Sequence, residues 1–266
     1  MGKKYRDLCS VYTKPFFICL ALSFFAQAVG TSAFLYYGSE IFYETQADLD
    51  EIEEREESAI ILDDFILGFF VLGNLISAFV IYKAGRKLMM LVSLPFAFIS
   101  LLLLAYTMKE ANYGDDDDSN EDDKQAYRHV ERVYFIIVVC VYITSIAIGL
   151  STTVWGITSE ILPNYLLATG SACSQSFGWI VNFGINTFFL DILDDPQGRW
   201  IVFLVLAAMV ALAIIFVAIF VPETVNKSAK ENLTDMYGKE YLHQQRKVLR
   251  KEYGIFDVEV KQPVIK

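Results

Sequence analysis

Six long runs of apolar residues dominate the chain, and short polar segments separate them. The runs cover residues 15–42, 59–82, 88–108, 133–158, 166–190 and 200–221. Roughly 20 consecutive apolar residues in a helix are enough to cross the hydrocarbon core of a bilayer. The pattern therefore predicts an all-α integral membrane protein, in which residues 1–226 form a bundle of six transmembrane helices and residues 227–266 form a tail.

Composition supports the same fold class and narrows the chemistry. The 266 residues are 55% hydrophobic and 20% charged, with a mean hydropathy of +0.40. The four cysteines have neither the spacing of a metal site nor that of a disulfide framework. The sequence also shows no nucleophile paired with a base and no glycine-rich phosphate loop. We therefore expect no metal, no cofactor, no enzymatic activity and no nucleic-acid partner.

The basic residues predict the orientation of the bundle, because Lys and Arg near the ends of spans are retained on the cytoplasmic side. With both termini in the cytoplasm, 16 of the 22 Lys and Arg residues lie inside, including Lys83, Arg86 and Lys87 after the second run. Of the 32 acidic residues, 23 then lie outside. We expect a multi-pass protein of the plasma membrane with both termini in the cytoplasm.

Polar side chains within the apolar runs are costly in a membrane, so their positions carry information about function. They form stripes with helical spacing in three of the six runs. The stripes comprise Ser23, Gln27, Gly30 and Thr31 in the first run, Ser145, Thr152, Trp155 and Ser159 in the fourth, and Gly170, Ser174, Gly178, Asn182 and Asn186 in the fifth, where Trp179 lies three residues before Asn182. Gly30, Gly149 and Gly156 are in addition candidate points at which a helix breaks, a feature of transporter binding sites.

The stripes have two interpretations. Small and polar residues let transmembrane helices pack closely and form hydrogen bonds to each other. Amides and indole rings near the middle of a membrane are also typical of a site for polyols, because amides bond to hydroxyl groups and a flat ring covers an apolar face. No run contains Lys, Arg or His, which excludes a voltage sensor and an anion pore. A hydroxyl-rich solute therefore fits better than an ion.

Charged residues gather at the predicted cytoplasmic ends of the runs. Glu160 ends the fourth run, and Arg86 lies in the tight turn after the second. A carboxylate and a guanidinium on different helices can form a charge-assisted pair that holds one side of a bundle together and breaks when that side opens. Retention of the loop in the cytoplasm is the alternative role for Arg86.

Several independent motifs occur in one order along the chain. They are Gly30 with Tyr36-Tyr37, Ala84-Gly85-Arg86-Lys87, Thr158-Ser159-Glu160 with Leu162-Pro163, and Val221-Pro222-Glu223-Thr224 with Lys227-Ser228. From about Arg6 to about Asn232 the chain thereby resembles the sugar porter family of the major facilitator superfamily, and more narrowly its six C-terminal helices. The resemblance implies one half of a carrier in which two six-helix halves surround a central cavity.

The resemblance also implies roles for individual residues. It implies sugar contacts at Gln27, Trp155, Trp179 and Asn182, with Ser32 at the position of the family's asparagine. It implies gating roles for Gly30, Tyr36, Tyr37, Arg86, Glu160 and Glu223. The chain departs from the family at the Gly-Pro-x-Pro-Trp hinge, which reads Ser151-Thr152-Thr153-Val154-Trp155 and has lost both prolines.

We expect transmembrane transport of a hexose or related polyol by alternating access, as part of a sugar-porter-like carrier. Alternating access needs two bundles that rock around one site. The expected partners are therefore a small-molecule sugar or polyol, the lipid bilayer, and an N-terminal six-helix half in the same or another chain, and we favour a chain that is part of a longer protein. The alternatives are a non-transporting regulatory or receptor-like half-transporter, and a carrier of a different small solute.

Overall fold

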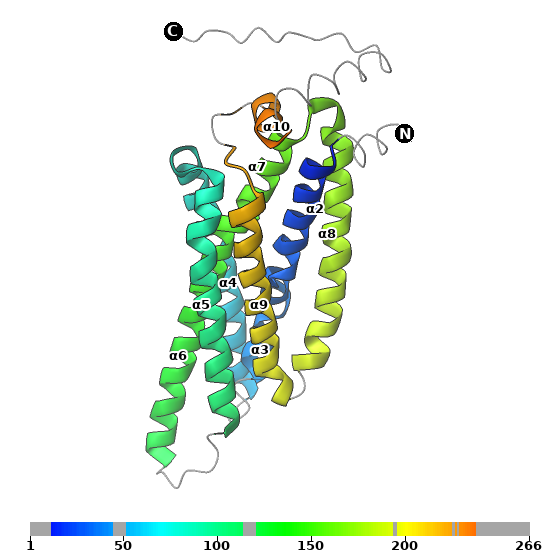
Figure 1. Cartoon of the computed structure of the whole chain (residues 1–266). Coiled ribbons are helices and arrows are strands. Elements are labelled where there is room, and N and C mark those ends of the chain that lie inside the picture. Colours follow the sequence, from blue (N-terminus) through cyan, green and yellow to red (C-terminus); the bar gives the residue numbers. More distant parts are fainter. Residues whose placement is uncertain are drawn as a thin grey trace.

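The computed structural model describes residues 12–44, 52–113, 121–193, 196–224, 227 and 229–237, which form a bundle of long helices (Figure 1). The first 11 residues, the acidic segment 114–120 and most of the predicted tail lie outside this part of the chain. The helices are α2 (Thr13–Ala28), α3 (Thr31–Glu44), α4 (Ile52–Ala84), α5 (Arg86–Tyr113), α6 (Glu121–Ile146), α7 (Thr152–Ile161), α8 (Asn164–Leu193), α9 (Pro196–Phe220) and α10 (Ala229–Tyr237), with a π-helical turn, η2 (Ala147–Ser151), between α6 and α7.

Each of the six predicted spans corresponds to one helix or to consecutive helices. By length and composition, five helical stretches of the described chain could cross a membrane: Thr13–Gly38, Ile60–Ala84, Arg86–Lys109, Val133–Ile161 and Trp200–Phe220. The 30-residue α8 is also long enough, at about 45 Å for 1.5 Å per residue. It also carries the stripe of glycine, serine and asparagine that the sequence shows.

The bundle has one continuous core of buried side chains, and the contact between α5 and α9 is its most extensive part. These two helices lie side by side in Figure 1, and α6 flanks α5. Leu94, Leu101, Phe203 and Val210 are fully buried there. Inside a bilayer the lipid is as apolar as these side chains, so close packing and hydrogen bonds between helices have to hold the bundle together.

The first span breaks where the sequence predicts, at Gly30. α2 ends at Ala28, α3 begins at Thr31, and Gly30 between them has a φ of +83°. This left-handed conformation favours glycine. A Cβ atom at this position would also lie 2.7 Å from Cδ2 of Leu206 on α9. The backbone conformation therefore favours glycine at the break, and a larger residue would in addition displace the Leu206 side chain.

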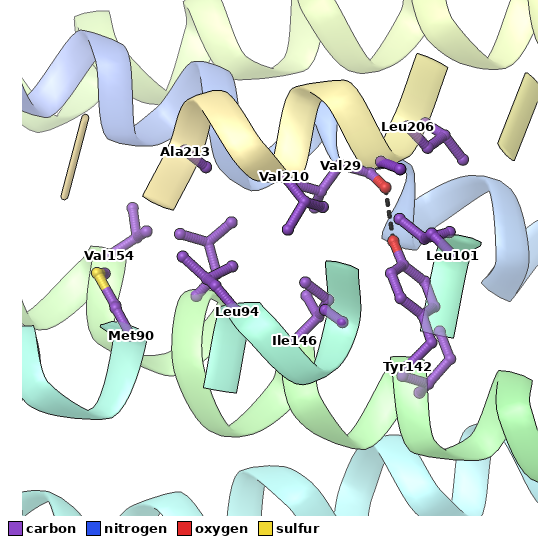
Figure 2. Close-up of a cluster of buried hydrophobic side chains, with 14 of the residues drawn as sticks. Val29, Met90, Leu94, Leu101, Tyr142, Ile146, Val154, Leu206, Val210 and Ala213 are labelled. Atoms are coloured by element: carbon purple, nitrogen blue, oxygen red, sulfur yellow. Dashed lines mark hydrogen bonds between the residues drawn. The ribbon is translucent and has the colours of Figure 1, made fainter. Parts of the chain in front are cut away.

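The break interrupts the regular hydrogen bonds of the helix, and Tyr142 of α6 compensates for part of this. In a continuous helix the N–H of Ala33 would bond to the carbonyl of Val29, but here it donates to Gly30 O at 3.0 Å. The Tyr142 hydroxyl donates to Val29 O at 2.5 Å, as Figure 2 shows. Tyr142 is fully buried between α2 and the core. A carbonyl that the break exposes is thereby satisfied away from water.

The fourth span is irregular at η2, next to the position where the family motif has prolines. Ser77 of α4 donates to Ile148 O at 3.0 Å. Thr152 Oγ1 lies 2.7 Å from Ala147 O and 2.8 Å from Ser77 Oγ, and its single proton serves one of these two acceptors at a time. These hydroxyl groups satisfy carbonyls of the wide turn, where the backbone cannot. Gly149 lies within this turn, whereas Gly156 lies inside the regular helix α7, so the predicted break at Gly156 is wrong.

The Tyr142 hydrogen bond can be tested by substitution. Tyr142→Phe should lower the free energy of unfolding by about 1–3 kcal/mol, because it leaves a buried carbonyl at the break without this donor. The measurement is the thermal unfolding temperature in detergent or nanodiscs. Tyr134→Phe is the matched control on the same helix, because that side chain is 36% exposed. Equal unfolding temperatures for the two variants would show that the bond contributes nothing.

Candidate functional site

Two polar residues of the broken first span meet a third from α8 at the break. Asn182 of α8 donates through Nδ2 to Gln27 Oε1 at 2.7 Å and to Ser32 Oγ at 2.6 Å. Gln27 is in the last turn of α2 and Ser32 in the first turn of α3, so they lie on the two sides of Gly30. Asn182 is 6% exposed. The break therefore brings both half-helices to one amide of α8.

Asn186 extends this cluster by one helical turn. Its Nδ2 donates to Asn182 Oδ1 at 2.8 Å, to Asn182 O at 3.0 Å and to Ser32 Oγ at 3.3 Å. The sequence places Asn186 on the amide-bearing stripe, four residues after Asn182, but the family resemblance implies a sugar contact only for Asn182. Gln27, Ser32, Asn182 and Asn186 are called the amide cluster below.

The small residues of the α8 stripe have the other predicted role, which is close packing between helices. Ser174 is fully buried, and Gly170 and Gly178 are buried. A Cβ atom on Gly178 would lie 3.3 Å from Ser23 O and 3.6 Å from Cγ of Gln27. The small residues thus let α2 and α8 approach closely, as small residues do in membranes. The packing interpretation therefore holds for this part of the helix.

The two predicted tryptophans differ from the amides in their surroundings. Trp155 of α7 is 60% exposed and Trp179 of α8 is 58% exposed. Trp179 lies three residues before Asn182, so the two side chains project from neighbouring positions of one helix face. An indole ring beside amides combines an apolar surface with hydrogen-bonding groups, the combination that a sugar ring needs.

The predicted gating tyrosines lie beyond the break, on α3. Tyr37 has non-helical angles, with φ of −125° and ψ of 20°, so α3 is kinked there. The ring of Tyr37 stacks on that of Phe189 of α8, with centroids 6.3 Å apart. The ring of Tyr36 contacts that of Tyr37 edge-on, with centroids 6.5 Å apart. Tyr36 itself is 60% exposed. The aromatic contact joins α3 to α8 at a second point besides the amide cluster.

Charged residues meet at the end of the bundle that contains the turn between α4 and α5, at the top of Figure 1. Arg86 Nη1 pairs with Glu160 Oε2 of α7 and donates to Thr224 Oγ1 at 3.3 Å. Glu223 Oε1 accepts the backbone N–H of Arg86 at 3.1 Å. The turn depends on Gly85, whose φ is +87°. Three predicted gating residues, Arg86, Glu160 and Glu223, thus form one network between α5, α7 and the segment after α9.

Three further contacts lie at the same end. Lys87 Nζ donates to Ala218 O at 2.9 Å in the last turn of α9, where a cation is favourable. Asn232 of α10 is buried and donates to Glu160 O at 3.3 Å. Lys227 donates to Asp235 at 2.7 Å, and this hydrogen bond raises the pKa of Lys227. Because the Lys227–Asp235 pair is exposed, it contributes little stability.

The described part of the chain contains no group of three or more His, Cys, Asp or Glu side chains that could hold a metal ion.

The sequence of this chain is similar to those of known proteins. Residues 2–235 match the family model described as "Sugar (and other) transporter". The chain is 28% identical over 225 residues to the facilitated trehalose transporter Tret1 of Apis mellifera ligustica, covering 83% of this chain and 40% of that protein. It is 25% identical over 219 residues to the arabinose-proton symporter of Bacillus subtilis (strain 168), covering 82% and 42%.

Solved structures give the same fold. A crystal structure of D-xylose-proton symporter superposes with a TM-score of 0.63 at 22% identity, covering 83% of this chain and 46% of the symporter. The chain thus spans less than half the length of these curated relatives and of this structure. The matching fold is that of one helical half of such a protein.

The Arg86 network yields a stability prediction. Arg86→Ala should lower the free energy of unfolding by about 1–3 kcal/mol, less than the roughly 3–5 kcal/mol of a fully buried pair, because the Arg86 and Glu160 side chains are 17% and 28% exposed. The measurement is the thermal unfolding temperature. Lys83→Ala is the matched control, since it removes a positive charge from the same turn at an exposed site. If both variants unfold alike, the charge acts in retention of the loop and the pair adds nothing.

Proposed function

This chain belongs to the sugar (and other) transporter family, and from that premise we propose that it forms half of a carrier that moves a hexose or related polyol across a membrane by alternating access. It is an integral, multi-pass membrane protein of the major facilitator fold. Members of this family are transporters rather than enzymes, so the substrate crosses without chemical conversion.

One observation carries the proposal: a cluster of amides lies at the break of a transmembrane helix. Gln27 and Ser32 come from the two half-helices, and Asn182 joins them. Buried amides without ligand would be costly in a membrane unless they bond to each other, as these do. A hydroxyl-rich ligand can replace such bonds by equivalent ones. Trp155 and Trp179 supply exposed ring faces in the same set of helices.

The second half of the carrier is part of the proposal. Alternating access requires two bundles around one site, and the chain spans 40% of the Tret1 relative described above. Only 17% of the residues in the most apolar part of Ile60–Ala84, on α4, are buried, and its exposed side chains include the apolar Phe65, Phe69 and Phe79. We propose that an N-terminal six-helix half, in the same or another chain, covers part of this surface and that lipid covers the rest.

The Arg86 network is the proposed cytoplasmic gate. It joins α5, α7 and the segment after α9 through Glu160, Glu223 and Thr224. Breaking these contacts would let the helices separate at that end, and the pairs would re-form on closure. The excess of Lys and Arg on this side supports a cytoplasmic location for it and for both termini. We place the carrier in the plasma membrane.

A receptor-like half-transporter is the alternative that a specific observation favours. The hinge motif has lost both prolines, and η2 is stabilised instead by Ser77 and Thr152 of neighbouring segments. A helix that is held in this way could bind a sugar without rocking. Binding without flux would support this alternative over transport, and displacement of labelled hexose at lower concentrations of inositol than of unlabelled hexose would favour a different solute.

The proposal predicts the effect of removing one amide. Asn182→Ala should weaken saturable D-glucose binding about 10-fold or more, because it removes hydrogen bonds worth about 1–3 kcal/mol in total. Binding is measured by quenching of tryptophan fluorescence with the full chain in nanodiscs, and uptake is measured in proteoliposomes. Thr187→Val is the matched control, because Thr187 is exposed on α8 and bonds only within its own helix, to Phe183 O.

L-glucose serves as the ligand control, since a specific site distinguishes the two enantiomers. Saturable binding of D-glucose that Asn182→Ala weakens and Thr187→Val preserves supports the proposed site. Equal binding by wild type and Asn182→Ala would remove Asn182 from the site. Absence of saturable, stereospecific binding by any hexose or polyol would overturn the proposed function.

A further inference from the structure

The hydrogen bonds of the amide cluster have one direction. Asn186 Nδ2 donates to Asn182 Oδ1 at 2.8 Å, and Asn182 Nδ2 donates to Gln27 Oε1 at 2.7 Å. An amide nitrogen donates and does not accept, whereas an amide oxygen only accepts. The orientation of each amide is therefore set by the one before it. Asn186, Asn182 and Gln27 are called the amide chain below.

A backbone carbonyl sets the direction of the whole chain. Asn186 Nδ2 also donates to the main-chain oxygen of Asn182 at 3.0 Å. That oxygen can only accept, so Asn186 has to turn its nitrogen toward Asn182. If Asn182 were rotated by 180° about its last torsion, its nitrogen would face the nitrogen of Asn186, and two donors would oppose each other.

The free end of the amide chain is the nitrogen of Gln27. Its oxygen is occupied by Asn182, and within the described residues no hydrogen bond is formed by Gln27 Nε2. Ser32 Oγ accepts from both Asn182 and Asn186, so its own proton remains to be donated. Gln27 Nε2 and the Ser32 hydroxyl are thus two donors left for a ligand, whereas the one buried acceptor of the cluster without a partner in the described structure is Asn186 Oδ1, at the other end of the chain.

We propose that Asn186 is a positioning residue that orients the Gln27 amide with its NH2 group toward the ligand, so that the site selects a ligand oxygen able to accept a hydrogen bond. The inference rests on the proposed function, because it concerns the same site. The substrate hydroxyl that faces Gln27 then acts as an acceptor. Neither the family match nor the sequence stripe assigns this role to Asn186.

The inference is tested with analogues that separate accepting from donating. A fluorine atom can accept a hydrogen bond but cannot donate one, and a hydrogen atom can do neither. The panel consists of D-glucose with each hydroxyl in turn replaced by hydrogen or by fluorine. For wild type in nanodiscs, one position should lose binding about 10-fold when deoxygenated and keep most of it when fluorinated. Gln27→Leu should remove this sensitivity.

Two variants of Asn186 then test its role. Asn186→Asp at pH 8 places an acceptor beside Asn182, so Asn182 and Gln27 should both turn over and Gln27 should present its oxygen. The ratio of the dissociation constants of the fluoro analogue and D-glucose should then rise about 10-fold. Asn186→Leu leaves Asn182 and Gln27 free to adopt either amide orientation. The same ratio of dissociation constants should then rise about 2-fold, since Gln27 presents its oxygen in half of the molecules. Thr187→Val should keep the wild-type ratio. Wild-type ratios in both Asn186 variants would overturn the inference.

A second measurement does not depend on sugar binding. Asn186 and Gln27 share no hydrogen bond in the described structure and are coupled only through Asn182. The shifts in unfolding temperature caused by Asn186→Leu and Gln27→Leu should therefore be non-additive, and they should become additive in an Asn182→Leu background. Gln27→Leu combined with Thr187→Val should be additive. If no sugar binds, the proposed function fails, and this double-mutant cycle alone then tests the amide chain. Additive shifts in unfolding temperature would overturn the amide chain.

Discussion

The structure depends on how a transmembrane helix can be broken without leaving backbone groups unpaired. At Gly30 the first span changes direction, and the N–H of Ala33 turns to Gly30 O. Water cannot satisfy the carbonyl of Val29 in the core, so the buried hydroxyl of Tyr142 does so from another helix. This bond ties α6 to the break, and the break in turn places Gln27 and Ser32 on the same amide of α8. The position of the proposed site is therefore a consequence of satisfying the backbone.

The same principle applies at the fourth span, with different groups. The wide turn η2 leaves carbonyls that Ser77 and Thr152 satisfy through their hydroxyls. The turn is irregular even though the neighbouring hinge motif has lost both prolines. Side-chain hydroxyls can stabilise an irregular turn in place of a proline. The two irregular spans flank one core, and the Arg86 network joins helices at one end of it. Rigid helices with a few polar connections are suited to rocking as units, which is the motion that the proposed function requires.

Much of this could be predicted from the sequence, and the failures have physical causes. The glycine at position 30 identified the break, because few other residues adopt a left-handed conformation without strain. The same argument failed at Gly156, which lies inside regular α7. A glycine in a helix permits a break but also permits close packing, and a Cβ atom there would lie 2.7 Å from Arg86 Nε. Only the neighbouring helix distinguishes the two uses. The family motifs likewise indicated Gln27 and Asn182, but not Asn186, whose position in the cluster depends on Ser32 across the break.

The sequence by itself determined the number of apolar runs, the all-helical membrane fold, the family and the polar stripe of α8, because each depends only on local composition and spacing. Spacing along one helix cannot specify which other helix a side chain meets. Tertiary structure alone decided that the stripe divides into a packing surface at Ser174 and Gly178 and an amide cluster at Asn182 and Asn186. It also decided the direction of the hydrogen bonds in that cluster, since the orientation of an amide depends on the donors and acceptors that the neighbouring helices bring to it.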